Sequence, residues 1–298
     1  MTKVLLTGAG GQDGYYLAHK LCRLGYEVYG VVRPGDPARY KYLTEVPFLS
    51  LVQADLLDYP SLMSVATVIY PDIIINTAGL TSPAACWGTP ELAFQVNGLG
   101  AVRLLETYAS PNIKFIQFGS IADFGPYGAS KQYAQVMMDD YRNRGFATTT
   151  IRFAGHHSPR RSGQFFSKKV VSVIAGIKRG EQGQLHLGDL SRSQDWGAAP
   201  DFMDAVIEIL DMEPGTYTVG TGDPYTLEEF VKAAFLIAEL NMDDHVVSES
   251  FHVQPYDVAS LSAGPDARLS WRPQVDFLQL VDWLVTSELE VPGVRINV

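Results

Sequence analysis

The stretch GSIADFGPYGASK, from Gly119 to Lys131, contains side chains whose types and spacing suit proton transfer. Tyr127 and Lys131 are separated by three residues and look like the proton-transfer pair of a hydride-transfer enzyme. Ser120 lies seven positions before Tyr127 and could assist the pair. We interpret Ser120, Tyr127 and Lys131 as candidate catalytic residues. The competing interpretation is that Tyr127 only packs, because Tyr-x-x-x-Lys often occurs by chance.

Short apolar strands alternate with helices over the first half of the chain. Such nearly continuous apolar strands are typical of parallel strands buried on both faces, so an α/β doubly wound (Rossmann) sheet is predicted. The predicted strands are 3–6, 27–32, 49–53, 73–76, 114–118 and 148–153. The predicted helices are 12–24, 89–108 and 127–142, the second with Leu92, Val96, Leu99, Val102 and Leu105 along one face.

A glycine-rich turn follows the first predicted strand. Gly8, Gly11 and Gly14 sit between that strand and a helix, where glycines let the backbone approach a pyrophosphate and the helix N-terminus supplies free N–H groups. We predict a dinucleotide at this turn, with Gln12 and Asp13 among its contacts. The alternative is a turn that binds nothing.

The second strand ends without a carboxylate. Arg33 follows it and can pair with a 2′-phosphate, and no acidic residue occurs before Asp36, so NADP is favoured over NAD. Arg33 as a solvated cation would fit NAD equally well. After the third strand, Asp55 and Leu56 are expected at the adenine edge. Ala78, within 76–79 after the fourth strand, is expected to line the cofactor groove.

The amino-acid composition limits the classes of function that the protein can have. The 298 residues are 46% hydrophobic and 19% charged, which is typical of a globular protein with a real core. A formal charge of −10 argues against sequence-independent nucleic-acid binding. Two cysteines form no metal-ligand spacing or disulfide framework, and no apolar stretch is long enough for a membrane span, so we expect a cytoplasmic protein.

The second half of the chain has a different character. Basic and polar residues appear in HHSPRRSGQFFSKK, followed by helices and short strands without regular alternation. We predict a dinucleotide-binding domain over 1–155 and mainly a substrate lobe over 156–298, with some elements returning to the first domain. Predicted elements there are a helix over 165–179, a strand over 184–187, a capping box of Thr226 with Glu229, and a last helix over 278–289.

The residues TGAGGQDGYYLA, VVRP and the Tyr127–Lys131 pair resemble the extended short-chain dehydrogenase/reductase enzymes that act on nucleotide sugars. Within this group, the chain is most similar to the GDP-mannose 4,6-dehydratase family. The similarity lies in QDG, HHSPRR, the run around Asp-Trp-Gly at 195–197 and LSWRPQVDF. The resemblance covers nearly the whole chain. It implies a GDP-hexose as substrate and a homodimer or higher homo-oligomer that pairs through helices of the first domain.

The resemblance also implies a mechanism. Tyr127, its pKa lowered by Lys131, would take the proton of the sugar C4 hydroxyl while hydride leaves C4 for the cofactor, and Ser120 would hydrogen-bond the same oxygen. In the family, a glutamate two residues after the serine then removes the C5 proton and helps expel the C6 hydroxyl.

The chain departs from the family pattern at that glutamate. Ala122 occupies its position, and Asp123 could substitute only through a local bulge. The loop between Ser120 and Tyr127 is nearly absent, and Gly155 stands where asparagine is common. Gln194 and Gln254 occupy places where arginines often grip the diphosphate.

Substrate contacts implied by the resemblance include a local basic cluster of Arg160, Arg161, Lys168 and Lys169, which could anchor a diphosphate. A solvated basic face is the alternative. The full set of expected substrate contacts is Thr81, His156, Ser158, Arg160, Arg161, Gln164, Lys169 and Gln194. His156 and His157 could suggest a metal, but adjacent strand residues point to opposite faces, so no metal site is predicted.

Three functional hypotheses remain open at this point. The first is a GDP-mannose 4,6-dehydratase-like lyase that uses NADP. The second is a GDP-sugar isomerase, either a C4 epimerase or a ring-form mutase, that does not dehydrate. The third is a nucleotide-binding protein with a retired active site, which the intact Tyr127 and Lys131 disfavour.

Overall fold

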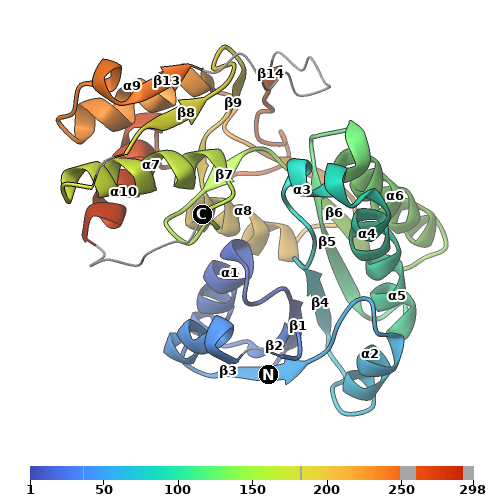
Figure 1. Ribbon diagram of the computed structural model, residues 1–298. Coiled ribbons are helices and arrows are strands. Elements are labelled where there is room, and N and C mark those ends of the chain that lie inside the picture. The colour runs from blue at the N-terminus through green and yellow to red at the C-terminus, as the bar shows by residue number, and fades with distance from the viewer. Residues whose placement is uncertain (36, 182, 249–259, 291–298) are drawn as a thin grey trace. The chain divides into compact units, whose positions relative to one another are not determined.

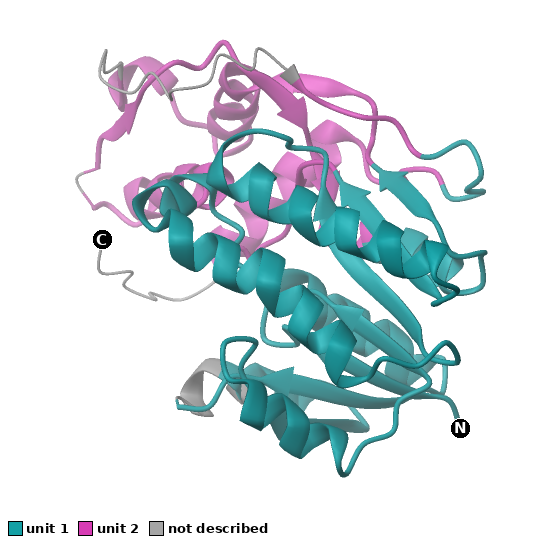
Figure 2. Ribbon diagram, turned by 90° about the vertical axis from the view of Figure 1, so that its right-hand side faces the viewer, with its two compact units in different colours: residues 1–153, 203–219, 266–271 teal, residues 154–202, 220–265, 272–298 magenta. Residues whose placement is uncertain are grey.

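The computed structural model describes residues 1–35, 37–181, 183–248 and 260–290. The chain forms two compact units, which Figure 2 colours separately. Unit 1 consists of residues 1–153, 203–219 and 266–271, and unit 2 consists of 154–202, 220–265 and 272–298. None of the helices in the described ranges is long and apolar enough to cross a membrane.

Unit 1 is built around a seven-stranded sheet in which every pair of neighbouring strands is parallel. The strand order is β11-β6-β5-β4-β1-β2-β3, so the order reverses between β1 and β4, where doubly wound folds bind ligands. The strands are β1 Lys3–Thr7, β2 Glu27–Val32, β3 Leu49–Gln53, β4 Ile73–Asn76, β5 Lys114–Ser120, β6 Thr148–Phe153 and β11 Thr216–Val219. The predicted doubly wound sheet is therefore confirmed.

Helices cover both faces of this sheet (Figure 1). The helices of unit 1 are α1 Gln12–Arg23, the 3₁₀ helix η1 Pro37–Glu45, α2 Tyr59–Ala66, α3 Pro83–Gly88, α4 Pro90–Ala93, the π-helix η2 Phe94–Leu99, α5 Gly100–Thr107, α6 Gly125–Asn143 and most of α8 Ala199–Leu210. An ion pair of 2.5 Å between Lys20 and Asp204 joins α1 to α8. The helices α2, α5 and α6 pack together, and the core beside them contains Ile74, Phe115 and Met138.

The predicted helix over 89–108 is present in three parts, and its apolar face differs from the prediction. The π-turn η2 adds a residue to a helical turn and so rotates the helix before it relative to the helix after it. Val102 and Leu105 are buried as expected, but Leu92 is 40% exposed. Leu92 therefore does not share a buried face with Val102 and Leu105, because the predicted face assumed a regular α-helical repeat.

Unit 2 packs short strands and helices around Trp196. The indole of Trp196 stacks on Phe230 at 4.4 Å between ring centres and on His157 at 4.7 Å. The strands are β7 His156–His157, β8 Leu185–Leu187, β9 Ser193–Asp195, β10 Gly197–Ala198, β12 Pro224–Thr226, β13 Val246–Ser248 and β14 Ser260–Leu261. The helices are α7 Phe166–Lys178, α9 Leu227–Ile237, η3 Met242–Asp244 and α10 Phe277–Glu290. The predicted capping box of Thr226 and Glu229 is present at the start of α9.

Candidate active site

The glycine turn between β1 and α1 has the geometry that a dinucleotide requires. A Cβ atom at Gly14 would lie 2.2 Å from the Gly8 carbonyl oxygen, so only glycine lets the start of α1 approach the turn this closely. Gly8 has φ = 69°, and a Cβ there would lie 2.6 Å from Thr77 Oγ1. The N-cap position of α1 is Gly11, which has no side chain to cap the helix. The turn therefore fits a pyrophosphate bound at a helix N-terminus.

Two tyrosines that the sequence did not single out contact this turn. A Cβ at Gly10 would lie 2.5 Å from the ring of Tyr40, and the Tyr42 hydroxyl donates a hydrogen bond to the Gly10 carbonyl oxygen. The rings of Tyr42 and Tyr15 are 5.6 Å apart in an edge-to-face arrangement. The segment after β2 thus holds the turn in place. No local sequence motif predicts these contacts, because they depend on how η1 folds back onto the glycine turn.

A row of buried polar side chains crosses the carboxyl ends of β1, β4 and β5. Thr7 donates to Asn76 at 2.5 Å, and Asn76 donates to Gln117 at 2.8 Å. All three side chains are about 1% exposed, and the hydrogen bonds offset the cost of burying them. The row fixes the strand ends from which the loop at 76–79 departs. Ala78 in that loop lies beside Gly8, with its backbone nitrogen 2.7 Å from a Cβ built there, as expected of a cofactor groove residue.

Lys131 is the buried cation of this site. It is 6% exposed, and its Nζ donates to the Phe118 carbonyl oxygen at 3.0 Å. Burial lowers the pKa of Lys131 from its usual 10.5 to about 8, and the carboxylate of Asp13 opposes that shift. Asp13 therefore links the glycine turn electrostatically to the lysine. Tyr127 stands one helical turn before Lys131 on α6 and is half-buried.

Asn97 organises the same site and was missed by the sequence analysis. Its Oδ1 accepts from the Leu80 N–H at 2.7 Å, while its Nδ2 donates to the Leu80 carbonyl at 3.0 Å and to Ser130 Oγ at 3.2 Å. Ser130 in turn donates to the Tyr127 carbonyl at 2.7 Å. The π-turn η2 carries Asn97, and such turns are frequent at functional sites. A buried asparagine within an apolar helix, in FQVNGL, was the available signal.

Ser120 is the last residue of β5, and Asp123 lies in the short connection between β5 and α6. The Ser120 hydroxyl accepts a hydrogen bond from the Ala122 N–H at 3.0 Å. Asp123 does not stand free, because both of its carboxylate oxygens lie 2.9 Å from the same guanidinium nitrogen of Arg152. Ala122 itself is 5% exposed and offers no titratable group.

Trp87 borders this connection. A Cβ at Gly125 would lie 3.1–3.3 Å from three atoms of the Trp87 indole, so the ring rests against the backbone two residues before Tyr127. Trp87 is nevertheless 41% exposed. Its position beside the short connection suits a wall of the site.

The remaining expected cofactor contacts lie around the second and third strands. Arg33 follows β2 and is exposed. Asp55 follows β3, and its carboxylate accepts from the Leu57 N–H at 2.9 Å. Leu56 is buried against Gly100 of α5. Asp36 lies outside the described residues.

The expected substrate contacts fall mostly in unit 2. His156 Nδ1 lies 2.8 Å from the Ala154 carbonyl oxygen and its ring stacks on Phe202, whereas burial holds the pKa of His157 well below its usual range. In the described part of the chain, no group of three or more His, Cys, Asp or Glu side chains could hold a metal ion. Gln254 lies outside the described residues.

The basic cluster of unit 2 is partly committed to internal contacts. Lys168 pairs with Glu288, and the Arg161 guanidinium lies 4.0 Å over the ring of Phe165. Lys169 donates to the His186 carbonyl oxygen at 3.0 Å and is exposed. The other expected contacts are Ser158, which is buried, half-buried Arg160 and Gln194, exposed Gln164, and, in unit 1, exposed Thr81.

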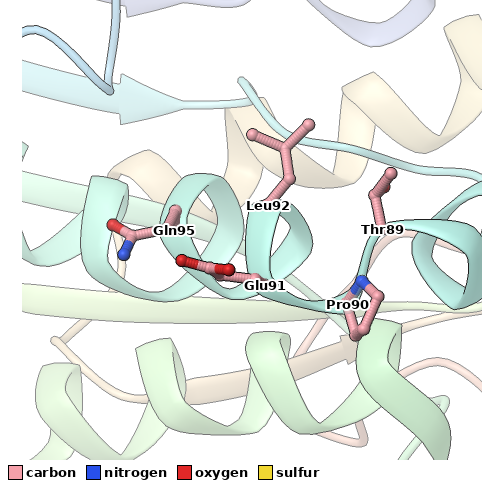
Figure 3. A pocket seen from close by; sticks show the side chains of 5 residues that line it. All are labelled: Thr89, Pro90, Glu91, Leu92 and Gln95. Carbon is pink, nitrogen blue, oxygen red and sulfur yellow. The ribbon is translucent and has the colours of Figure 1, made fainter.

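A surface hollow of about 480 Å³ lies at the start of α4 and does not belong to this site. Figure 3 shows its lining side chains, which come from the N-cap of α4, from α4 and from η2, namely Thr89, Pro90, Glu91, Leu92 and Gln95. None of the candidate catalytic side chains lines it.

The fold and the site define a nucleotide-sugar enzyme of the extended short-chain dehydrogenase/reductase type. The structure is similar to the UDP-glucose 4-epimerase of Thermotoga maritima, with a TM-score of 0.82, 20% identity and coverage of 96% of this chain and 98% of that one. It is also similar to the dTDP-glucose 4,6-dehydratase of Streptomyces venezuelae, with a TM-score of 0.83, 19% identity and 96% coverage of both chains. At these identities the likeness establishes the fold.

Comparison of sequences identifies the family more specifically than comparison of structures does. The profile of the GDP-mannose 4,6 dehydratase family matches residues 5–283. GDP-mannose 4,6 dehydratase 2 of Arabidopsis thaliana is 34% identical, over 96% of this chain and 87% of the relative. The human GDP-mannose 4,6 dehydratase is 28% identical, over 96% and 91%. The chain belongs to the GDP-mannose 4,6-dehydratase family, which confirms the resemblance seen in the sequence.

Proposed function

We propose that the protein oxidises the C4 hydroxyl of a GDP-hexose with NADP. The observation that carries the proposal is the Lys131 ammonium, buried at the end of β5 and one helical turn from Tyr127. When bound, the dinucleotide would accept hydride from the sugar and return it. NADP rather than NAD is supported by Arg33 at the end of β2, whose guanidinium can pair with a 2′-phosphate.

The chain's own residues supply the acid–base chemistry. The positive charge of Lys131 stabilises the phenolate of Tyr127, which takes the proton of the C4 hydroxyl. Ser120 donates a hydrogen bond to the same oxygen, while its own Oγ accepts from Ala122. We assign the glycine turn, Gln12, Asp13, Arg33, Asp55, Leu56 and Ala78 to the cofactor.

The sugar nucleotide would be held mainly by unit 2. We assign the diphosphate to Arg160, Arg161 and Lys169, since cations with several N–H donors bind phosphate oxygens strongly. The other proposed substrate contacts are His156, Ser158, Gln164, Gln194 and Thr81.

A second candidate function is an isomerase of GDP-sugars that does not eliminate water. It is favoured by one observation, the combination of a buried Ala122 at the expected base position with an Asp123 carboxylate that faces Arg152. Removal of the C5 proton would then lack a base, and hydride could only return to C4. A C4 epimerase fits this chemistry.

One experiment distinguishes these functions. GDP-mannose deuterated at C4 is incubated with the purified protein and NADP, and the product is analysed by mass spectrometry and NMR. A dehydratase gives a product that has lost one water and carries deuterium at C6. A C4 epimerase gives a product of unchanged mass with deuterium at C4. A new ring form made without dinucleotide would indicate a mutase, and unchanged substrate at high enzyme concentration would reject all three.

We also propose that the protein forms a homodimer through unit 1. Leu92 of α4, Phe94 of η2 and Val136 of α6 are 40%, 38% and 62% exposed. Phe94 contacts Tyr133, which is one helical turn before Val136 on α6. The apolar patch of Leu92, Phe94, Tyr133 and Val136 suits burial against a second copy of the chain.

A further inference from the structure

The connection between β5 and α6 is short, and the structure holds it tightly. It contains the four residues Ile121–Phe124. The Ile121 N–H donates to the Phe153 carbonyl at 3.1 Å, and Gln132 of α6 donates to the Asp123 carbonyl at 3.3 Å. A Cβ at Gly128 would lie 2.8 Å from the Ala122 carbonyl oxygen, so the connection lies directly on the first turn of α6.

Arg152 bonds to the residue just before this connection and to a residue within it. It lies on β6, opposite Gly119 of β5. Its Nε donates to the Ser120 carbonyl oxygen at 3.2 Å, and one terminal nitrogen lies 2.9 Å from each carboxylate oxygen of Asp123. One guanidinium group therefore ties the last residue of β5 to the middle of the connection.

The chemistry of this pair differs from that of a catalytic base. A base must present a lone pair to the proton on the sugar carbon. Both oxygens of Asp123 instead accept charge-assisted hydrogen bonds from Arg152. The side chain is also 52% exposed, so water surrounds its other side.

We propose that Arg152 and Asp123 form a positioning pair that sets Ser120 against Tyr127 in place of a longer loop. Arg152 holds the Ser120 carbonyl, and its ion pair with Asp123 fixes the backbone from which α6 begins. Asp123 therefore acts through Arg152 and does not act as the base. This inference rests on the proposed function for its catalytic consequence, but its structural consequence can be measured separately.

The test uses the full-length chain and the variants Asp123→Asn, Arg152→Met and the double variant. Hydrogen–deuterium exchange of the amides in 120–128 reports positioning without any turnover. We expect each single variant to speed exchange there by roughly tenfold, and the double variant to add little more, because either change removes the same pair. The matched control is the exposed pair Arg144–Asp140 at the end of α6, whose variants Arg144→Met and Asp140→Asn should leave 120–128 unchanged.

Activity provides the second readout. If the wild-type protein converts a GDP-hexose, each variant should lower kcat by roughly tenfold with little change in KM, and the acid limb of the pH profile should stay in place. Loss of turnover in Asp123→Asn with full activity in Arg152→Met would make Asp123 the base and overturn the proposal. Unchanged exchange at 120–128 in Arg152→Met would also overturn it. If the wild-type protein converts no GDP-hexose, the proposed function fails, while the exchange data still decide the positioning role.

Discussion

Lys131 places a positive charge where water is excluded, and this has opposite effects on stability and on catalysis. Burial lowers its pKa from 10.5 to about 8. At about 1.4 kcal/mol per pKa unit, keeping the group charged at pH 7 costs roughly 3 kcal/mol of folding free energy. In the proposed mechanism, the same charge stabilises the Tyr127 phenolate that takes the proton of the C4 hydroxyl.

The variant Lys131→Met should therefore be more stable than the wild type at pH 7 and inactive. The unfolded state binds the lysine proton more tightly, so the wild type gains stability as pH rises from about 8 towards 10.5. Thermal unfolding should show a higher Tm for Lys131→Met at pH 7 and a smaller difference above pH 10. An equal or lower Tm at pH 7 would mean that the amine's hydrogen bond to Phe118 outweighs its burial.

Tyr127→Phe should keep cofactor binding and lose most turnover. The hydroxyl is the proposed base, and loss of general base catalysis costs about 10²–10⁴-fold in rate. NADPH fluorescence titration should give a Kd close to that of the wild type. Wild-type turnover in Tyr127→Phe would instead support a non-redox mutase, and no turnover in either protein would fit a retired site.

At the scale of elements, the start of α6 depends on two glycines. Gly125 has φ = 67°, and Gly128 lies against the Ala122 and Asp123 backbone. Together they let the chain leave β5 and enter the helix with only four residues between the two elements.

Gly128→Ala should destabilise the protein by about 1–3 kcal/mol, because its Cβ would lie only 2.8 Å from two backbone atoms. Chemical denaturation measures the change. The matched control is Gly88→Ala at the end of α3, where a Cβ would meet nothing within 4 Å. Equal stability of the two variants would show that the connection can shift without cost.

Elements with local signals could be predicted from the sequence. The first six strands of unit 1 follow from apolar runs, whereas β11 was not predicted, and the turn at Gly8 follows from its glycine spacing between a strand and a helix. Asn97 could not be placed, because the π-turn changes the helical repeat. The pairing of Arg152 with Asp123 could not be predicted either, since it depends on the register of β6 against β5. Contacts between distant segments are set by register and packing, which no local pattern encodes.

At the scale of the whole molecule, the apolar patch on α4, η2 and α6 predicts an oligomer. Light scattering coupled to size-exclusion chromatography should show a dimer for the wild type. Leu92→Glu and Val136→Glu should shift it to a monomer, because each places a charge in the buried interface. Leu236→Glu on α9, where the side chain is 78% exposed, is the control and should remain dimeric. A monomeric wild type would contradict the proposal.

The chain passes between the two units five times, at 153/154, 202/203, 219/220, 265/266 and 271/272. Strand β11, which pairs with β6 along Thr216–Val219, is made long after the other six strands of its sheet. During synthesis the edge of β6 therefore stays unpaired until β11 has been made. An unpaired strand edge promotes aggregation. Bacterial expression of a fragment ending at 153 should give insoluble protein, and a nascent chain should become protease-resistant only after residue 271 has emerged.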